Sequence, residues 1–293
     1  MAYARYTGVG GESVNLIYRG VEGRAADIGR ALSKVFGVDG VCADITLPSN
    51  ELAELRRIVT DSWLAVVGNA APEAVERFRE LGIENYHQLS HLLDHAHVWT
   101  THARTFESSQ VDVIRSFGIF DLLKLEFPDY TISSAMPPYG DLGRPRINWR
   151  LVRPGDGTDI GPIHADYWFD AVLDGWRDEP GPTVKLKIWI PIFLEEGTTG
   201  FAFVPGSHLR QYPFRRVNVG EGLFKPDLRE ADLDQPLQTL PTAPGAAVLF
   251  NYNLVHRGAN SGRATRTRVS MELTLNIPRE QLQERFGNVS RYH

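Results

Sequence analysis

Three residues of the sequence, His164, Asp166 and His256, have side chains that could bind one metal ion together. Residues i and i+2 of an extended strand point to the same face, so the imidazole of His164 and the carboxylate of Asp166 are expected to converge. His256 follows a predicted strand over 246–250 after a short turn. Two imidazoles and one carboxylate on one face of an ion leave three coordination positions open, which suits Fe(II) and oxygen chemistry.

A second group of side chains could bind a carboxylate. Arg266, Arg268 and Ser270 alternate along the chain at the start of a predicted strand over 268–275, so they are expected to share one face. An arginine can bind a carboxylate through two parallel charge-assisted hydrogen bonds, and a serine hydroxyl two residues later can add a third.

These residues belong to the second half of the chain, where short predicted strands alternate with turns rich in Gly and Pro. Several short strands punctuated in this way indicate a sandwich or barrel. The first half has apolar residues at helical spacing and predicts helices. The predicted strands are 146–152, 183–191, 200–204, 246–250 and 268–275, and the predicted helices include 51–59, 71–78 and 111–123.

The length of 293 residues suits one large domain, and we predict a single α+β domain over 1–293 with a mainly β core. Within it, about 20–132 would form a helical support region and about 145–278 the core. The polar segment 209–243 separates two predicted strands and is too long for an ordinary connection. It is therefore predicted to be an insertion that closes over the site as a lid.

With these motifs the sequence resembles the phytanoyl-CoA dioxygenase-like group of Fe(II)/2-oxoglutarate oxygenases. The resemblance covers about residues 145–278 and consists of several short motifs in the order in which the family has them. These are His164-x-Asp166, the turn 204–208 (Val-Pro-Gly-Ser-His), the strand start Pro244-Gly245, His256, and Arg268-x-Ser270. The combination is much more specific than any one of these motifs.

The resemblance implies a double-stranded β-helix, or jelly roll, with the N-terminal helical region packed on one sheet. It implies Fe(II) on His164, Asp166 and His256. It also implies 2-oxoglutarate as co-substrate, with its far carboxylate on an arginine ten to twelve residues after the second histidine. Arg268 is the preferred candidate because Arg-x-Ser is the fuller match, and Arg266 also fits this spacing. With O2, such enzymes decarboxylate 2-oxoglutarate and oxidise a C–H bond of the substrate.

Four further residues are candidates for contact with substrate. Tyr167 and Trp168 follow Asp166 in an aromatic run that could line a pocket. Lys187 shares a strand face with Trp189, opposite an apolar face, and Arg150 lies on the first core strand. For Arg150 a structural ion pair is an equal alternative. Because aromatic and cationic side chains are mixed here, we expect a small polar substrate.

Other patterns favour less specific interpretations. His87, His91 and His95 are spaced i, i+4, i+8, which would place them on one face of a helix, although they lack the frame of a zinc protease. Ser207 and His208 are adjacent, so in a strand they would face opposite ways, and a role in the turn is favoured over a nucleophile and base.

The composition excludes several protein classes. With 31 Lys and Arg against 36 Asp and Glu, the net charge of −5 does not favour nucleic-acid binding. The sequence has no apolar run of the roughly 18–20 residues that a membrane helix needs, and its N-terminus does not resemble a secretory signal. The single cysteine, Cys42, excludes an internal disulfide and a cysteine-based zinc site. A cytoplasmic protein is expected.

These observations predict an Fe(II)/2-oxoglutarate-dependent dioxygenase. Its expected reaction is the hydroxylation of an unactivated C–H bond of a small polar metabolite. A biosynthetic or tailoring role is what the resemblance implies. Two alternatives stay open. One is a cupin-like metalloenzyme that uses the His/Asp/His site without 2-oxoglutarate, and the other is a non-catalytic small-molecule binder with the same fold.

Overall fold

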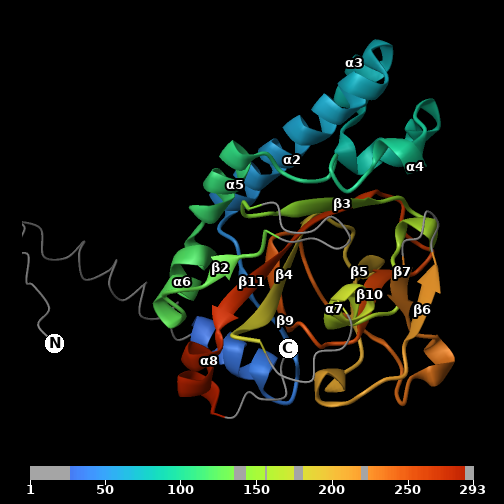
Figure 1. Ribbon diagram of the computed structural model, residues 1–293. Coiled ribbons are helices and arrows are strands. Elements are labelled where there is room, and N and C mark those ends of the chain that lie inside the picture. The colour runs from blue at the N-terminus through green and yellow to red at the C-terminus, as the bar shows by residue number, and fades with distance from the viewer. Residues whose placement is uncertain (1–26, 135–142, 156, 175–180, 219–223, 288–293) are drawn as a thin grey trace, which may run out of the picture.

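The core of the protein is a jelly roll of antiparallel sheets, as predicted. The computed structural model describes residues 27–134, 143–155, 157–174, 181–218 and 224–287 (Figure 1), so the predicted start of the helical region at 20–26 lies outside the described residues. The larger sheet has the order β1-β9-β4-β11-β2, and β3 also pairs with β11. Its strands are β1 (Val41–Thr46), β2 (Thr131–Ile132), β3 (Asn148–Val152), β4 (Thr183–Phe193), β9 (Ala246–Asn251) and β11 (Arg268–Pro278).

A smaller sheet faces the larger one and has the order β10-β5-β8. Its strands are β10 (His256–Asn260), β5 (Thr199–Phe203) and β8 (Gln238–Leu240). A separate hairpin joins β6 (Arg215–Asn218) to β7 (Phe224–Asp227). All three sheets are antiparallel, and each strand predicted in the second half of the sequence is present within a few residues of its expected bounds.

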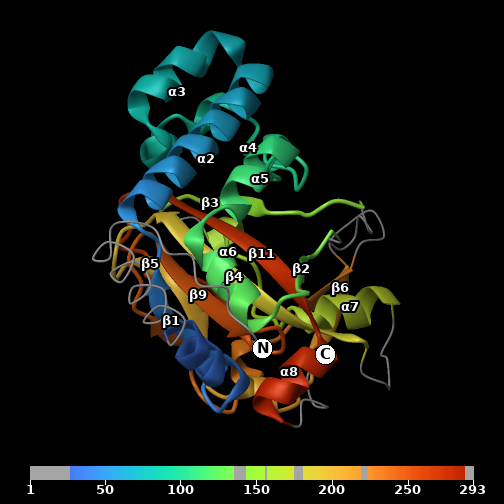
Figure 2. The same cartoon turned by 90° about the vertical axis from the view of Figure 1, so that its left-hand side faces the viewer.

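Helices from the first half of the chain cover the outer face of the larger sheet (Figure 2). None of the helices that the structure describes combines the length and apolar character needed to cross a lipid bilayer. The region contains a helix over 27–36 and α2 (Ser49–Ala70), α3 (Val75–Leu81), α4 (His95–Val98), α5 (Ser108–Arg115) and α6 (Gly118–Glu126), with 3₁₀ turns η1 (Pro72–Ala74), η2 (Ile83–Gln88) and η3 (Ser90–Leu92). The remaining helices are α7 (Tyr167–Asp174) and α8 (Arg279–Phe286), and the remaining 3₁₀ turns are η4 (Gly157–Asp159), η5 (Ser207–Leu209) and η6 (Glu230–Asp232).

The alternation of side chains along β4 decides which face of the larger sheet is apolar. Leu186, Ile188 and Ile190 are fully buried against the helices in the main core. Lys187 and Trp189 point the other way, into the jelly roll, as the strand period of two requires. The sheet therefore has one face that stabilises the fold and one face that is available for a site.

Two details of the predicted elements were wrong. The helical pattern over 111–123 is divided between α5 and α6, because the chain turns at Ser116 and Phe117. The segment 209–243 is not a simple insertion between strands. It begins at the last residue of η5 and contains the β6–β7 hairpin, η6 and β8, and β8 is an integral strand of the smaller sheet through its pairing with β5. A lid role for this segment stays a prediction.

A buried carboxylate joins the helical region to the core. Asp159 in η4 accepts hydrogen bonds from the Arg153 backbone N–H and guanidinium at 2.8–2.9 Å, and it lies 3.2 Å from Nε2 of His95. The Tyr86 hydroxyl lies 2.9 Å from Nδ1 of His95 and accepts from the Trp99 indole at 2.7 Å. If His95 carries its proton on Nε2, every group in this chain of hydrogen bonds has a partner.

Replacing Asp159 with Asn should lower the free energy of unfolding by about 3 kcal/mol, because it removes the charge from a buried ion pair. Burial raises the pKa of Asp159, but hydrogen bonds from Arg153 and His95 outweigh burial and hold that pKa well below its ordinary value. A carboxyl with a depressed folded-state pKa stabilises the protein above its unfolded pKa of about 3.9, and the stability is lost as the pH falls through the folded pKa.

Urea unfolding of the parent and the variant, from pH 7 down to pH 3, checks this prediction. A variant as stable as the parent at pH 7 would contradict it, and E73Q, on the exposed face of η1, is the control.

Candidate metal centre

His164, Asp166 and His256 lie together inside the jelly roll, and one potential ligand atom from each lies within 4.8 Å of the others. The two histidines form an isolated β-bridge, with N–H···O distances of 3.0 and 2.8 Å in the two directions. Asp166 lies in the turn that leads into α7. The predicted His-x-Asp pair is therefore at the end of an extended segment and not within a continuous strand.

The two imidazoles are oriented in the same way. Nδ1 of His164 lies 2.8 Å from the carbonyl oxygen of Pro162, and Nδ1 of His256 lies 2.9 Å from that of Leu254. In each case the neutral ring donates its Nδ1–H to the carbonyl, which leaves the Nε2 lone pair free. A backbone acceptor behind the ring is the usual way in which proteins fix the tautomer and direction of a metal-binding histidine.

The Asp166 carboxylate completes the group. Its Oδ2 lies 3.7 Å from Nε2 of His256 and is buried without a hydrogen-bond partner among the described residues. Burial raises the pKa of Asp166, but the charges of Lys187 and the two histidines hold it below its ordinary value. Burial and then the neighbouring His164 lower the pKa of His256 to about 4. One carboxylate and two neutral imidazoles, with an orphaned oxygen among them, fit a divalent cation.

Aromatic rings surround the histidines. Phe201 lies parallel to the His256 ring at a centroid distance of 5.2 Å, and Phe250 lies edge-on at 4.8 Å. Phe169 is edge-on to His164 at 5.3 Å. Phe169 belongs to the aromatic run that follows Asp166, whereas Phe201 and Phe250 belong to no motif in the sequence. Two of them could have been found, because Phe201 and Phe250 have the strand parity that points into the jelly roll.

Arg268 is buried at the start of β11, on the inner face of the larger sheet. Its Nη1 donates to the carbonyl oxygen of Gly200, and its guanidinium carbon lies 5.8 Å from the centre of the Trp189 ring. Nε of Arg268 and Oγ of Ser270, the next inward residue, are both buried without hydrogen-bond partners among the described residues. Burial and then the charge of Arg150 lower the pKa of Arg268 to about 10. An anion at this position would satisfy both orphaned groups.

The strand opposite makes room for this guanidinium. A Cβ atom added to Gly258 on β10 would lie 2.9 Å from Nη2 of Arg268, which is closer than such atoms approach one another. A side chain at position 258 would therefore displace the arginine from its place beside Trp189 and Gly200.

The prediction that Arg266 shares a face with Arg268 and Ser270 is wrong. Arg266 precedes the first residue of β11, and its guanidinium is exposed, where it pairs with Glu84. The alternation of a strand cannot be extended past its end, and the turn before β11 directs Arg266 to the surface. Of the two candidate arginines, only Arg268 lies in the interior.

The predicted contact of Tyr167 and Trp168 with substrate is not supported by their positions. They begin α7, and Trp168 is 1% exposed and stacks on Phe214 at a centroid distance of 4.7 Å. Tyr167 packs against the same small apolar cluster. Because the chain becomes helical directly after Asp166, these rings pack against the segment around Phe214, and Phe169 is the ring that reaches His164.

Lys187 and Arg150 do point into the jelly roll. Nζ of Lys187 lies 3.6 Å from Oδ1 of Asp166. Arg150 lies 2.7 Å from Glu272, so the structural ion pair considered for it is present. Glu272 shares the inward parity of Arg268 and Ser270 on β11, and this parity could have identified it from the sequence.

The two weaker patterns have structural roles. His87, His91 and His95 do not line one helix, because the chain forms η2, η3 and α4 in succession, and His87 instead contacts Thr267 at 3.0 Å. Ser207 accepts a hydrogen bond from the Val255 backbone N–H at 2.9 Å. It is thus a turn residue that holds the segment leading to His256, as predicted from its place next to His208.

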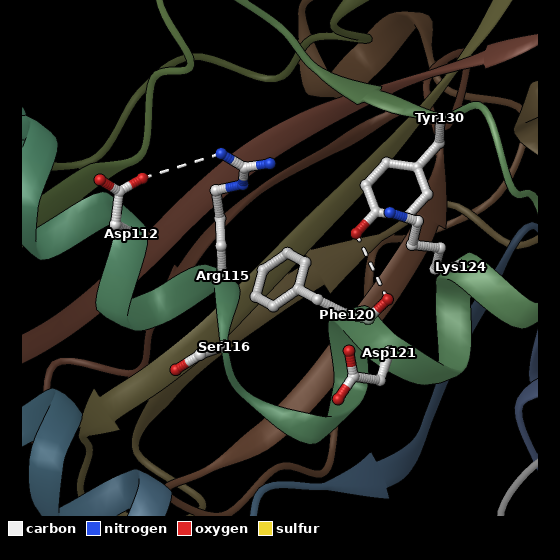
Figure 3. A pocket seen from close by; sticks show the side chains of 7 residues that line it. All are labelled: Asp112, Arg115, Ser116, Phe120, Asp121, Lys124 and Tyr130. Atoms are coloured by element: carbon white, nitrogen blue, oxygen red, sulfur yellow. Dashed lines mark hydrogen bonds and ion pairs between the residues drawn. The ribbon is translucent and has the colours of Figure 1, made fainter.

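A surface hollow exists elsewhere on the protein. It lies on α5, α6 and the connection to β2, and Figure 3 shows the side chains of Arg115, Phe120 and Tyr130 around it. Two acidic and two basic residues line it, and Arg115 lies 3.8 Å from Asp112, so it has no surplus charge. It is built on the outer helical layer and contains none of the candidate site residues.

Comparison with known proteins agrees with this geometry. A model of the phytanoyl-CoA dioxygenase (PhyH) family matches residues 143–268. This range includes His164, Asp166, His256 and Arg268. No protein in the curated set matches the chain.

Several solved structures are similar in fold. A non-heme monooxygenase, ThoJ in its apo form, is 14% identical with a TM-score of 0.50, over 85% of this chain and 78% of that chain. The alpha-ketoglutarate-dependent epimerase SnoN from nogalamycin biosynthesis is 16% identical with a TM-score of 0.46, over 86% and 81%. EctD from S. alaskensis, solved with 2-oxoglutarate and 5-hydroxyectoine, is 17% identical with a TM-score of 0.42, over 86% and 76%. The family match extends from before β3 to the first residue of β11, so the chain resembles the phytanoyl-CoA dioxygenase family over the strands that carry the candidate metal ligands and Arg268.

Proposed function

We propose that this protein is a non-haem iron, 2-oxoglutarate-dependent oxygenase that hydroxylates an unactivated C–H bond of a small polar metabolite, in a biosynthetic or tailoring role in the cytoplasm. His164, Asp166 and His256 would hold Fe(II), and Arg268 with Ser270 would hold the far carboxylate of 2-oxoglutarate. One observation carries the proposal. His256 of the metal cluster begins β10, and Gly258 on the same strand lies against the buried guanidinium of Arg268. Nε of Arg268 and Oγ of Ser270 have no hydrogen-bond partner among the described residues.

The bound iron and 2-oxoglutarate would supply an oxidant able to remove hydrogen from carbon. The chain's own residues would position and shield the reactants. Arg268 would offer two parallel N–H groups to the carboxylate, and Ser270 would donate a third hydrogen bond. Phe169, Phe201 and Phe250 would exclude bulk water from the side of the imidazoles against which they pack.

Lys187 and Arg150 would contact the substrate or the open side of the metal site. Among the described residues, the only polar contact of the Lys187 ammonium is the 3.6 Å approach to Asp166. A mostly buried ammonium without a close acceptor is unfavourable, so a bound polar molecule would compensate it.

An anaerobic titration tests the proposal. Fe(II) and then 2-oxoglutarate are added to the purified apo-protein while the visible spectrum is recorded. We expect a weak charge-transfer band that requires both additions, and succinate release once O2 and a substrate are supplied. Tight iron binding without a band would favour the cupin-like alternative. Absence of iron binding would contradict the assignment of the three ligands and favour a non-catalytic binder.

A further inference from the structure

The Asp166 carboxylate directs its two oxygens to different partners. Oδ2 lies 3.7 Å from Nε2 of His256, and Oδ1 lies 3.6 Å from Nζ of Lys187. The side chains of Lys187 and Asp166 are 10% and 15% exposed, so bulk water competes little for either group. One oxygen of the carboxylate therefore belongs to the cluster of potential metal ligands, while the other faces a cation.

The larger sheet determines the position of Lys187. The residue lies on β4, and its direct neighbours across the two adjoining strands are Phe250 on β9 and Thr274 on β11. Phe250 packs edge-on against the His256 ring at a centroid distance of 4.8 Å. Because β4 is hydrogen-bonded to a strand on each side, the lysine projects toward the metal cluster from a well-supported part of the fold.

The pairing of Lys187 with Asp166 is specific. Among the described residues, Asp166 is the only carboxylate that pairs with the Lys187 ammonium. Lys185, two residues earlier on the same face of β4, has a separate partner, since its ammonium lies 2.6 Å from the carboxylate of Asp170. The two lysines of this face are thus assigned to different carboxylates, and the partner of Lys187 is a candidate metal ligand.

The way in which Asp166 binds a metal ion decides how many coordination positions stay open. Three protein ligands leave three positions on an octahedral ion, and a chelating 2-oxo acid takes two of them. A carboxylate can bind through one oxygen or through both. If both oxygens of Asp166 bound the ion, they would take the position that O2 needs. A cation beside Oδ1 opposes this, because it attracts that oxygen away from the metal.

We propose that Lys187 is a positioning residue that keeps Oδ1 of Asp166 off the metal, so that the carboxylate binds through Oδ2 alone and one coordination position stays open. A movement of less than about 1 Å would bring the ammonium within hydrogen-bond distance of Oδ1. The inference rests on the proposed function for the metal and co-substrate, and it gives Lys187 a role that is exerted through Asp166.

Nitric oxide tests the inference, because it binds to an open position on Fe(II) and needs no substrate. The full-length protein is loaded anaerobically with Fe(II) and 2-oxoglutarate, and NO binding is followed by electron paramagnetic resonance. In K187M we expect NO affinity to fall about tenfold while Fe(II) affinity stays equal or rises, because a repelling cation is lost and Oδ1 becomes free to bind. K187R, which keeps a cation, should retain most of the NO affinity.

The matched control is K185M. It removes the neighbouring lysine from the same strand face, where the partner is Asp170, so its NO affinity should equal that of the parent. K187Q removes the charge but keeps a polar group, so it replaces K187M if the methionine variant does not fold. A structural lysine would not produce the expected pattern, because its loss would weaken Fe(II) binding together with stability.

Two results would overturn the inference. Parental NO affinity in folded K187M or K187Q would show that Lys187 does not act on the open position and would assign it to the substrate. Fe(II) affinity reduced tenfold, with unchanged NO affinity of the iron that remains bound, would assign it to ligand retention. A parent protein without the charge-transfer band refutes the proposed function itself, whereas a normal band in the parent with either of these two results refutes the role of Lys187 alone.

Discussion

Replacing His256 with alanine should weaken Fe(II) binding by at least about 100-fold and remove 2-oxoglutarate turnover. The ring presents Nε2 to the cluster because Nδ1 is held by the Leu254 carbonyl, so the substitution removes one of three ligands and leaves Asp166 with a single imidazole. Anaerobic titration with Fe(II), followed by calorimetry or by the charge-transfer band, measures the effect.

The matched control is H97A. His97 is exposed and pairs with the carboxylate of Asp94 in its own turn, so its loss should leave iron affinity unchanged. His256 also packs against Phe201 and Phe250, and H256Q retains more of that packing while still removing the imidazole. Parental iron affinity in a folded H256A or H256Q protein would show that this histidine is not a ligand.

The inner surface of the site could be predicted where strand parity decides the direction of a side chain. Lys187 and Trp189 on β4, and Arg268 and Ser270 on β11, all point inward as their alternation requires. The same rule applies to Glu272, but a single acidic residue in a strand forms no motif that would mark it as part of a site. Arg150 pairs with it across two strands that are 122 residues apart in sequence, and such long-range partners are not visible in a local pattern.

The alternation of side chains along a strand no longer predicts their direction where the strand ends. Arg266 precedes β11 by two residues, and the turn there sends it to Glu84 at the surface. Tyr167 and Trp168 follow Asp166 directly, and the change from extended chain to α7 rotates them into an apolar cluster. For His87, His91 and His95 the spacing was helical, but the chain forms tight 3₁₀ turns in which residues three apart align. The motifs therefore identify the candidate site, while the ends of helices and strands decide which neighbouring side chains point into it.

Replacing Arg268 with methionine should weaken binding of 2-oxoglutarate by about 100-fold while iron binding stays as in the parent. The guanidinium is buried at the start of β11, and its Nε, like the hydroxyl of Ser270, has no hydrogen-bond partner among the described residues, so a bound carboxylate would satisfy both groups. Titration of 2-oxoglutarate into the anaerobic, iron-loaded protein gives the affinity. R266M is the matched control, since that arginine is exposed and paired with Glu84.

The same substitution separates a binding role from a structural one. A buried guanidinium without its anion costs free energy, whereas methionine fills a similar volume without a charge. We therefore expect the melting temperature of R268M without co-substrate to equal or exceed that of the parent, and the stabilisation that 2-oxoglutarate gives the iron-loaded parent to disappear. G258A, which crowds the guanidinium from β10, should lower 2-oxoglutarate affinity by a smaller factor. A clear loss of stability in R268M with co-substrate affinity retained would instead assign Arg268 to the fold, and the anchor would have to be sought at Arg150 or Lys187.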